Sequence, residues 1–174
     1  MITPSFAQKM SRYSCWQNEQ IYGIADQMTD AARRQDLGMC FGTIHNTLSH
    51  MLWDDHMIMS CLTGAKLPDV TTVRTSVRLH EDWEELKQAH HLSDQSIRDW
   101  TDGLSEEWLA GEALWNSGAA EQEGRKQRSV LIMQLFNHQT HHRGQLHVML
   151  SQQGAKMFHT DLSFMPETTD LKAA

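Results

Sequence analysis

The sequence predicts an all-α fold, a four-helix bundle with a crossover between the third and fourth helices. Only three prolines occur in the 174 residues, at positions 4, 68 and 166, which leaves two long stretches without a helix breaker. Within them apolar residues recur at the three- and four-residue spacing of helices, and strand-like alternation is almost absent. Four helices of roughly 25 residues, rising about 1.5 Å per residue, pack most economically as a bundle.

The first two helices have clear limits in the sequence. The first is expected from Pro4 to about residues 28–30, because Thr3 suits the N-cap and proline suits the first helical position. The second is expected from about Leu37 to Leu62, because Thr63-Gly64 is a typical helix end. Residues 65–75 then form a connector.

The second half of the chain holds the third helix, the crossover and the fourth helix. The third helix is expected from about Ser76 to Asp102, where Gly103 ends it. Residues 104–124 contain three glycines and no sustained period, so we interpret them as the crossover, with a short hairpin as one form it can take. The fourth helix is expected over about 125–153. The whole chain, 1–174, is predicted to be one domain with a C-terminal tail from about residue 155.

Composition and charge exclude several classes of partner. With 15 Lys and Arg against 22 Asp and Glu, the formal charge is −7, which disfavours binding to nucleic acid or to an anionic membrane. No apolar stretch is long enough to span a bilayer, and the first residues lack the features of a signal peptide. Three cysteines without a CxxC motif are typical of a reducing compartment. We therefore expect a cytoplasmic protein.

The chemistry is expected to involve the 11 histidines, above all a cluster in the fourth helix. His138 and His142 are four residues apart, so a helix places both imidazoles on one face, at a spacing that suits two ligands of one metal ion. By the same rotation His141 points away. The alternative is structural, with one histidine packed in the core and the other at its rim.

A transition-metal site needs a further ligand, which the second or third helix can supply. The second helix offers His45, His50 and His56, and periodicity alone does not choose among them. On the third helix His90 is either a fourth ligand or, more simply, a packed and hydrogen-bonded core residue.

Two further residues of the fourth helix stand beside the histidine pair. Gly144 costs a helix about 1 kcal/mol relative to alanine, which suggests close helix approach there, or else a tolerated imperfection. Arg143 either orients an anionic substrate group or forms an ion pair with a neighbouring acid.

Four segments resemble the DinB/YfiT-like family, and the resemblance covers nearly the whole chain. They are 137–145 (NHQTHHRGQ), 150–154 (LSQQG), 49–53 (SHMLW) and 160–162 (TDL). The resemblance implies a four-helix bundle, a homodimer, and a metal ion held by one histidine of the second helix and the HxxxH pair of the last. Carried onto this sequence, it implies His50, His138 and His142 as ligands.

The resemblance also implies a metal-dependent hydrolase, or a transferase that uses a low-molecular-weight thiol, acting on a small molecule. Three imidazoles leave an open coordination position, where a zinc-like ion lowers the pKa of bound water to about 7 and deprotonates a bound thiol. Imidazole accepts several late divalent ions, of which we favour zinc or nickel.

No catalytic base is assured by these motifs, since the HxxxH pair lacks the adjacent glutamate of metalloproteases. Asp54, one turn after His50, is the best candidate base or acceptor for a ligand imidazole, ahead of Asp55 and Asp161. The alternative function is a non-catalytic stress or interaction protein that a metal ion stabilises.

Overall fold

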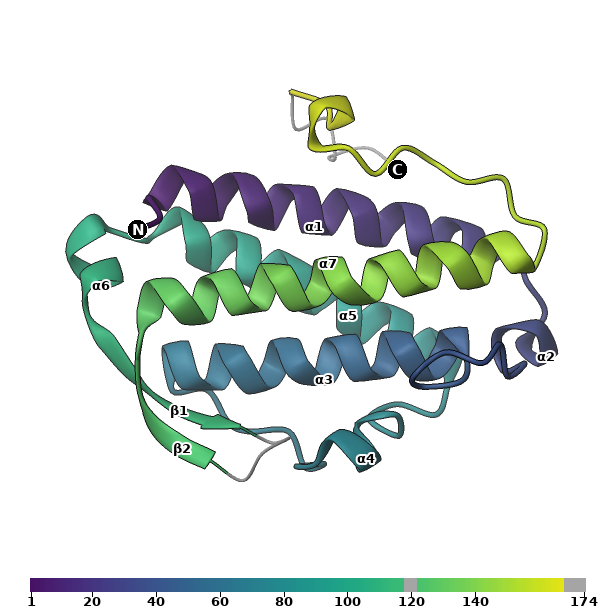
Figure 1. Ribbon diagram of the computed structural model, residues 1–174, viewed down its shortest axis with the longest axis horizontal. Coiled ribbons are helices and arrows are strands. Elements are labelled where there is room, and N and C mark those ends of the chain that lie inside the picture. Colours follow the sequence, from purple (N-terminus) through teal and green to yellow (C-terminus); the bar gives the residue numbers. More distant parts are fainter. Residues whose placement is uncertain (118–121, 168–174) are drawn as a thin grey trace.

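Four long helices lie alongside one another in the computed structural model, which describes residues 1–117 and 122–167 (Figure 1). They are α1 (Pro4–Ala25), α3 (Ile44–Thr63), α5 (Trp83–Asp102) and α7 (Arg128–Gln152). Helix α1 packs against α5 and α7, and α3 packs against the same two helices. The mostly helical fold is therefore as predicted.

Shorter elements connect the long helices. They are α2 (Asp30–Arg33), α4 (Val73–Ser76), α6 (Glu106–Ala110), β1 (Glu112–Ser117), β2 (Gln122–Gln127) and the 3-10 turn η1 (Leu162–Phe164). Strands β1 and β2 form an antiparallel hairpin in which Glu112 pairs with Gln127 and Leu114 with Arg125. Ala113 and Trp115 face the core while Leu114 between them is 64% exposed, so the apolar residues of β1 are consecutive and leave no alternating pattern in the sequence.

Three predicted helix limits are wrong, two because a local cap overrides the apolar rhythm and one because a strand precedes the helix. The second long helix begins at Ile44 and not at residue 37, since the Thr43 side chain accepts a hydrogen bond from the Asn46 amide. The third begins at Trp83 and not at residue 76, because Asp82 caps it in the same way. The fourth begins at Arg128, since residues 125–127 belong to β2.

The first helix ends at Ala25, slightly before the predicted limit. The Ala25 carbonyl accepts from the Met28 amide in a turn, and the guanidinium of Arg33 also donates to the carbonyls of Ala25 and Met28. The chain therefore turns there into α2 rather than continuing the helix.

The apolar core has two parts, with a buried polar layer between them. One cluster includes Ile21, Leu48, Leu86 and Leu146, and the other includes Ala7, Ile58, Ile97 and Phe136. On each long helix, buried polar residues fall between these clusters in the sequence: Asn18, Asp55, His90, Asp94 and Gln139. Sequence analysis did not predict this layer.

After α7 the chain turns back over α7 and α1 (Figure 1). Gly154 makes the turn with φ of 81°, and two side chains of α1 then hold the returning segment. The Tyr13 hydroxyl donates to the carbonyl of Thr160, and the Gln17 amide donates to the carbonyl of His159. The predicted tail thus lies against the helices up to about residue 160, the described residues beyond it are mostly exposed, and 168–174 lie outside the described residues.

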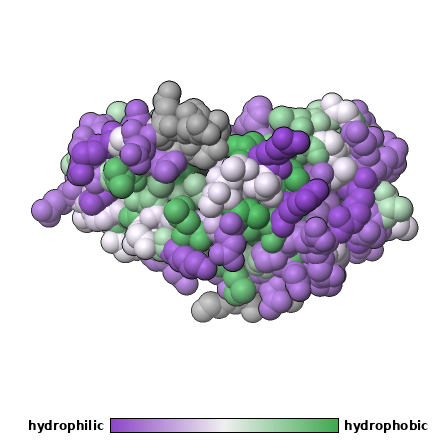
Figure 2. Space-filling model, turned by 90° about the horizontal axis from the view of Figure 1, so that it is seen from below, coloured by the Kyte–Doolittle hydropathy of each residue, from purple (hydrophilic) through white to green (hydrophobic). Residues whose placement is uncertain are grey.

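The surface is mainly hydrophilic. Seen from the side of α4 and the hairpin, apolar residues show through near the middle of the face (Figure 2). Among the residues that the structure describes, no helix is long and apolar enough to cross a membrane.

Candidate metal centre

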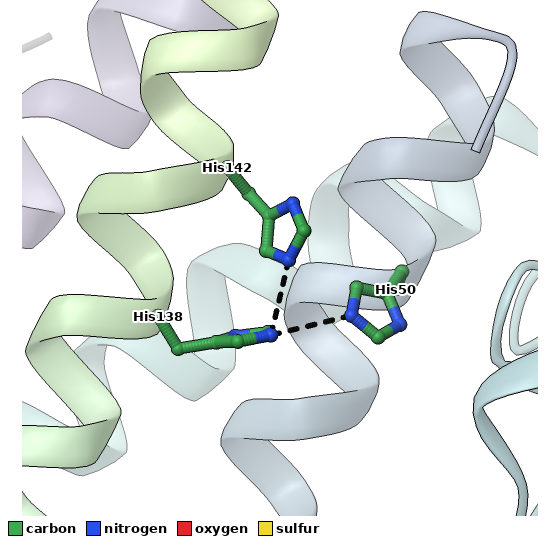
Figure 3. Close-up of side chains that lie close together, drawn as sticks. All are labelled: His50, His138 and His142. Carbon is green, nitrogen blue, oxygen red and sulfur yellow. Dashed lines mark hydrogen bonds between the residues drawn. The ribbon is translucent and has the colours of Figure 1, made fainter. Parts of the chain in front are cut away.

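Three histidines from two adjacent helices point their imidazoles at one another (Figure 3). His50 comes from α3, and His138 and His142 come from successive turns of α7. The Nε2 atom of His138 lies 3.3 Å from Nε2 of His50 and 3.0 Å from Nε2 of His142. One nitrogen from each ring lies within 4.8 Å of the other two, so the three can share a single ion.

Packing holds the His50 ring in place. The Phe41 ring stacks on it with centroids 3.9 Å apart, and Trp53 stacks at 5.6 Å. His50 is 3% exposed and His142 is 4% exposed. Burial, together with the neighbouring imidazoles, lowers the pKa of His50 to about 3 and that of His142 to about 4. Both rings are therefore neutral at pH 7, the form that binds a metal ion.

Two of the three outer nitrogens face a hydrogen-bond acceptor. Nδ1 of His50 lies 2.8 Å from the Ser76 hydroxyl, whose own proton goes to the carbonyl of Val73, so the imidazole donates. Nδ1 of His142 lies 3.0 Å from the Gln145 amide oxygen, which can only accept. In both rings the proton is on Nδ1, which leaves a lone pair on Nε2.

The third outer nitrogen faces a carboxylate. Nδ1 of His138 lies 3.0 Å from Oδ2 of Asp54. The angle is not that of a hydrogen bond, and neither atom has another partner among the described residues. A rotation of the ring would convert the contact into a carboxylate–imidazole hydrogen bond and would fix the same tautomer in His138.

This arrangement fits a bound cation. The Nε2 lone pairs of His50 and His142 both face Nε2 of His138, and with the His138 proton held on Nδ1 by Asp54 the three lone pairs would repel one another unless a positive charge lay between them. A tetrahedral zinc ion with Zn–N bonds of about 2.0–2.1 Å places its nitrogen ligands about 3.3 Å apart. The separations of 3.0 and 3.3 Å are close to that spacing.

The other candidate histidines lie apart from this cluster. His45 contacts the carbonyl of His80, and His56 lines a groove between α3 and α5. His90 contacts Tyr22 through Nδ1 and Asn18 through Nε2, and it is fully buried. The interpretation of His90 as a packed core residue is therefore correct, and its interpretation as a fourth ligand is wrong.

A cavity of about 280 Å³ opens beside His50 and His138. Its walls are mainly apolar, and the hairpin contributes Trp115 and Asn116 to them. The remaining lining residues are Trp53, Asp54, Met57, Ile58, Cys61, Val73 and Gln134. A small molecule in this cavity would lie against two of the three histidines.

Comparison with protein families matches the DinB family over residues 1–172. The chain belongs to the DinB family. It is 24% identical over 166 residues to Protein DinB of Bacillus subtilis (strain 168), an alignment that covers 94% of this chain and 96% of the relative. A crystal structure of a DinB-like protein from Bacillus cereus ATCC 10987 has 22% identity and a TM-score of 0.48. That alignment covers 80% of this chain and 87% of the other.

The three candidate carboxylates of this DinB protein lie in different places. Asp54 lines the cavity and contacts His138. Asp55 is fully buried in the polar layer, where it accepts a hydrogen bond from the Gln139 amide and where burial raises its pKa. Asp161 is exposed. Only Asp54 is close enough to the histidines to act on them.

Arg143 does not reach the metal-side cavity, and Gly144 does not mark a close contact. Arg143 lines a different cavity, between α7 and α1, and within residues 1–117 and 122–167 no carboxylate lies within ion-pair distance of it. The ion pair predicted for it is therefore absent among these residues, whereas a role toward an anionic group stays a prediction, at a cavity other than the one beside the histidines. A Cβ atom added to Gly144 would meet nothing within 4 Å, so the prediction of close helix approach is wrong.

Sequence reasoning missed several residues that build this site. Gln145 could have been found from its spacing of three residues from His142 on the same helix. Ser76, Phe41 and Trp115 come from a short helix, a loop and a hairpin, and no periodic signal places them near the histidines.

Proposed function

We propose that this DinB protein is a metal-dependent enzyme that transfers a low-molecular-weight thiol to a small apolar electrophile. The observation that carries the proposal is the convergence of three Nε2 atoms whose rings each have an acceptor atom within 3.0 Å of the outer nitrogen. We propose His50, His138 and His142 as ligands of one zinc or nickel ion, since imidazole accepts either.

A divalent ion held by three imidazoles would keep one position open and supply a bound thiol in its thiolate form. The chain's own residues do the rest. Asp54 orients His138, and Trp53 and Trp115 line an apolar cavity that binds the electrophile and excludes water. The new carbon–sulfur bond forms as the bond to the leaving group breaks, and the thiol proton passes to solvent.

The position of Asp54 supports thiol transfer over hydrolysis. Among the described residues that line the cavity, Asp54 is the one carboxylate, and its Oδ2 lies 3.0 Å from Nδ1 of His138. Metal-bound water with a pKa of about 7 is only partly ionised at neutral pH and gains from a nearby base, whereas a metal-bound thiol is deprotonated outright. The walls favour an uncharged, apolar substrate group because they hold five apolar side chains, Trp53, Met57, Ile58, Val73 and Trp115.

Elemental analysis of the untagged protein tests the site. We expect about one zinc or nickel ion per chain in the wild type, and loss of the metal in His50→Ala, His138→Ala and His142→Ala. His91→Ala is the matched control, because His91 is exposed on α5 and contacts Gln95. His141 is less suitable, since it contacts the Gln145 side chain that holds His142. Absence of metal after incubation with zinc and nickel would overturn the proposed site.

Thiol transfer is tested by following consumption of cysteine or glutathione with 1-chloro-2,4-dinitrobenzene, a small apolar electrophile. We expect turnover that chelation and His142→Ala abolish and His91→Ala preserves. Metal-dependent hydrolysis of p-nitrophenyl acetate without thiol transfer would assign the site to a hydrolase. A bound metal that raises the melting temperature, with neither reaction, would favour the non-catalytic, metal-stabilised protein.

A homodimer remains a prediction, which light scattering coupled to size-exclusion chromatography checks.

A further inference from the structure

Arg143 is a buried cation without a counterion in the described part of the chain. It is 5% exposed, and no carboxylate oxygen lies within 4 Å of its guanidinium. Its contacts are one hydrogen bond to the Thr140 hydroxyl, a long one of 3.5 Å to Gln139, and the face of the Tyr13 ring. Burying a charge is costly unless an opposite charge compensates it, so this position calls for an anion.

The nearest acids compensate this charge poorly. Asp55 and Asp94 act on Arg143 from beyond ion-pair distance. Burial raises the pKa of both, to about 7 for Asp94, so neither carries a full negative charge near neutral pH.

Arg143 faces a cavity of about 330 Å³ that shares no lining residue with the cavity at the metal centre. It lies between α1, α7 and the returning C-terminal segment, which forms its roof through the bonds from Tyr13 and Gln17. Gly144 leaves room in its wall, since nothing lies within 4 Å of the position of a Cβ. His147 also lines it, and the Nε2 atom of that ring is buried without a hydrogen-bond partner.

We propose that this cavity binds a small monocarboxylate, with the Arg143 guanidinium as its cationic partner. A guanidinium offers paired, planar N–H donors that match a carboxylate, and its hydrogen bond to the Thr140 hydroxyl holds it in place. Among the described lining residues Arg143 is the one that is permanently charged, and Ile21 and Phe158 are apolar, so a single negative charge on an apolar body fits best. The volume is at the small end of the range of about 300–1,000 Å³ for small-molecule sites.

Butyrate is a suitable probe, with butyramide as its uncharged counterpart and inorganic phosphate as a more highly charged anion. We expect butyrate to raise the melting temperature saturably and to give a binding isotherm by calorimetry, and butyramide and phosphate to give neither. Arg143→Gln should lower the affinity for butyrate at least about tenfold, the change expected for loss of a charge-assisted hydrogen bond. Arg12→Gln is the matched control, because Arg12 is exposed on α1.

Two further variants separate the possible outcomes. Gly144→Leu fills the cavity without removing a charge or a hydrogen bond, so it should block the binding of butyrate. This variant tests the proposed site if Arg143→Gln does not fold. His50→Ala should leave butyrate binding intact, because the site does not include the metal ligands. No effect of butyrate on the wild type, an effect that survives in Gly144→Leu, loss of binding in His50→Ala, or equal binding of phosphate would each overturn the proposal.

Discussion

Side-chain contacts outside the histidine triad decide which nitrogen of each imidazole is available to a metal ion. Ser76 and Gln145 hold two of the outer nitrogens, and Asp54 lies 3.0 Å from the third. Replacing such an outer partner typically costs 10- to 100-fold in metal affinity. The acceptors are therefore as much part of the proposed site as the ligands.

Asp54→Asn tests this role for the carboxylate. The amide has the same shape without the negative charge, so we expect metal affinity to fall by about 10- to 100-fold while the fold is kept. Competition with a chromogenic chelator measures the change, and Asp69→Asn is the control because Asp69 is exposed and pairs with Lys66. If Asp54→Asn bound zinc and nickel as tightly as the wild type, Asp54 would not be positioning His138.

The polar layer makes a separate prediction about pH. Burial raises the pKa of Asp94 from 3.8 to about 7. The unfolded chain therefore loses this proton at lower pH than the folded chain, and stability falls as the pH rises from about 4 through 7. In Asp94→Asn the side chain cannot ionise, and its amide oxygen can still accept from Asn18, which donates to Asp94 in the wild type.

We expect Asp94→Asn to be more stable than the wild type at pH 8, on the order of a few kcal/mol, since each displaced pKa unit corresponds to about 1.4 kcal/mol. The difference should shrink as the pH falls to 5. Urea unfolding of both proteins across this range measures it. A difference that stays constant with pH would mean that Asp94 does not change its ionisation there.

How far the sequence predicts the site depends on the kind of signal that each residue leaves. His138 and His142 follow from a four-residue spacing on one helix. His50 could not be chosen over His45 and His56 by rotation, because α3 is buried on several faces and its periodicity does not single out one of them. Only the family resemblance pointed to it. Ser76 is brought to His50 by tertiary packing alone.

At the scale of the helices, limits were predicted well where the sequence itself carries the stop. Thr3 and Pro4 begin α1, and Gly64 follows α3 with φ of 76°. The predicted limits were wrong where apolar residues also occur on the N-terminal side of a cap, as they do before Thr43 and Asp82. Periodicity reports burial, and a loop packed against the core is buried too.

Helix α7 also carries a residue that weakens it. Gly144 lies in its interior, and a Cβ there meets nothing within 4 Å. Since glycine costs about 1 kcal/mol relative to alanine in a helix, Gly144→Ala should raise the free energy of unfolding by about that amount. Chemical denaturation checks this. Gly23→Ala is a matched control, because that glycine is also helical and open, and a similar gain is expected there. A loss of stability in Gly144→Ala alone would show that the space beside it is needed by the fold.

At the scale of the whole molecule, the proposed metal centre joins α3 to α7 beside the polar layer that divides the apolar core. All three histidines come from these two helices, so an ion bound to them requires the folded arrangement. An unfolded chain does not hold the three imidazoles together. Metal binding should therefore stabilise the folded protein by mass action.

The melting temperature should rise with the concentration of free zinc or nickel. When the concentration of free metal ion is a hundred times the dissociation constant, the free energy of unfolding rises by about 2.7 kcal/mol. Chelation should reverse it, and His142→Ala should show little dependence on metal, while His91→Ala should behave as the wild type. The effect should also weaken as the pH falls, because protons then compete for the imidazoles. A melting temperature of the wild type that does not change with metal concentration would contradict a stabilising ion between α3 and α7. An equal change in His142→Ala would place the ion at another site.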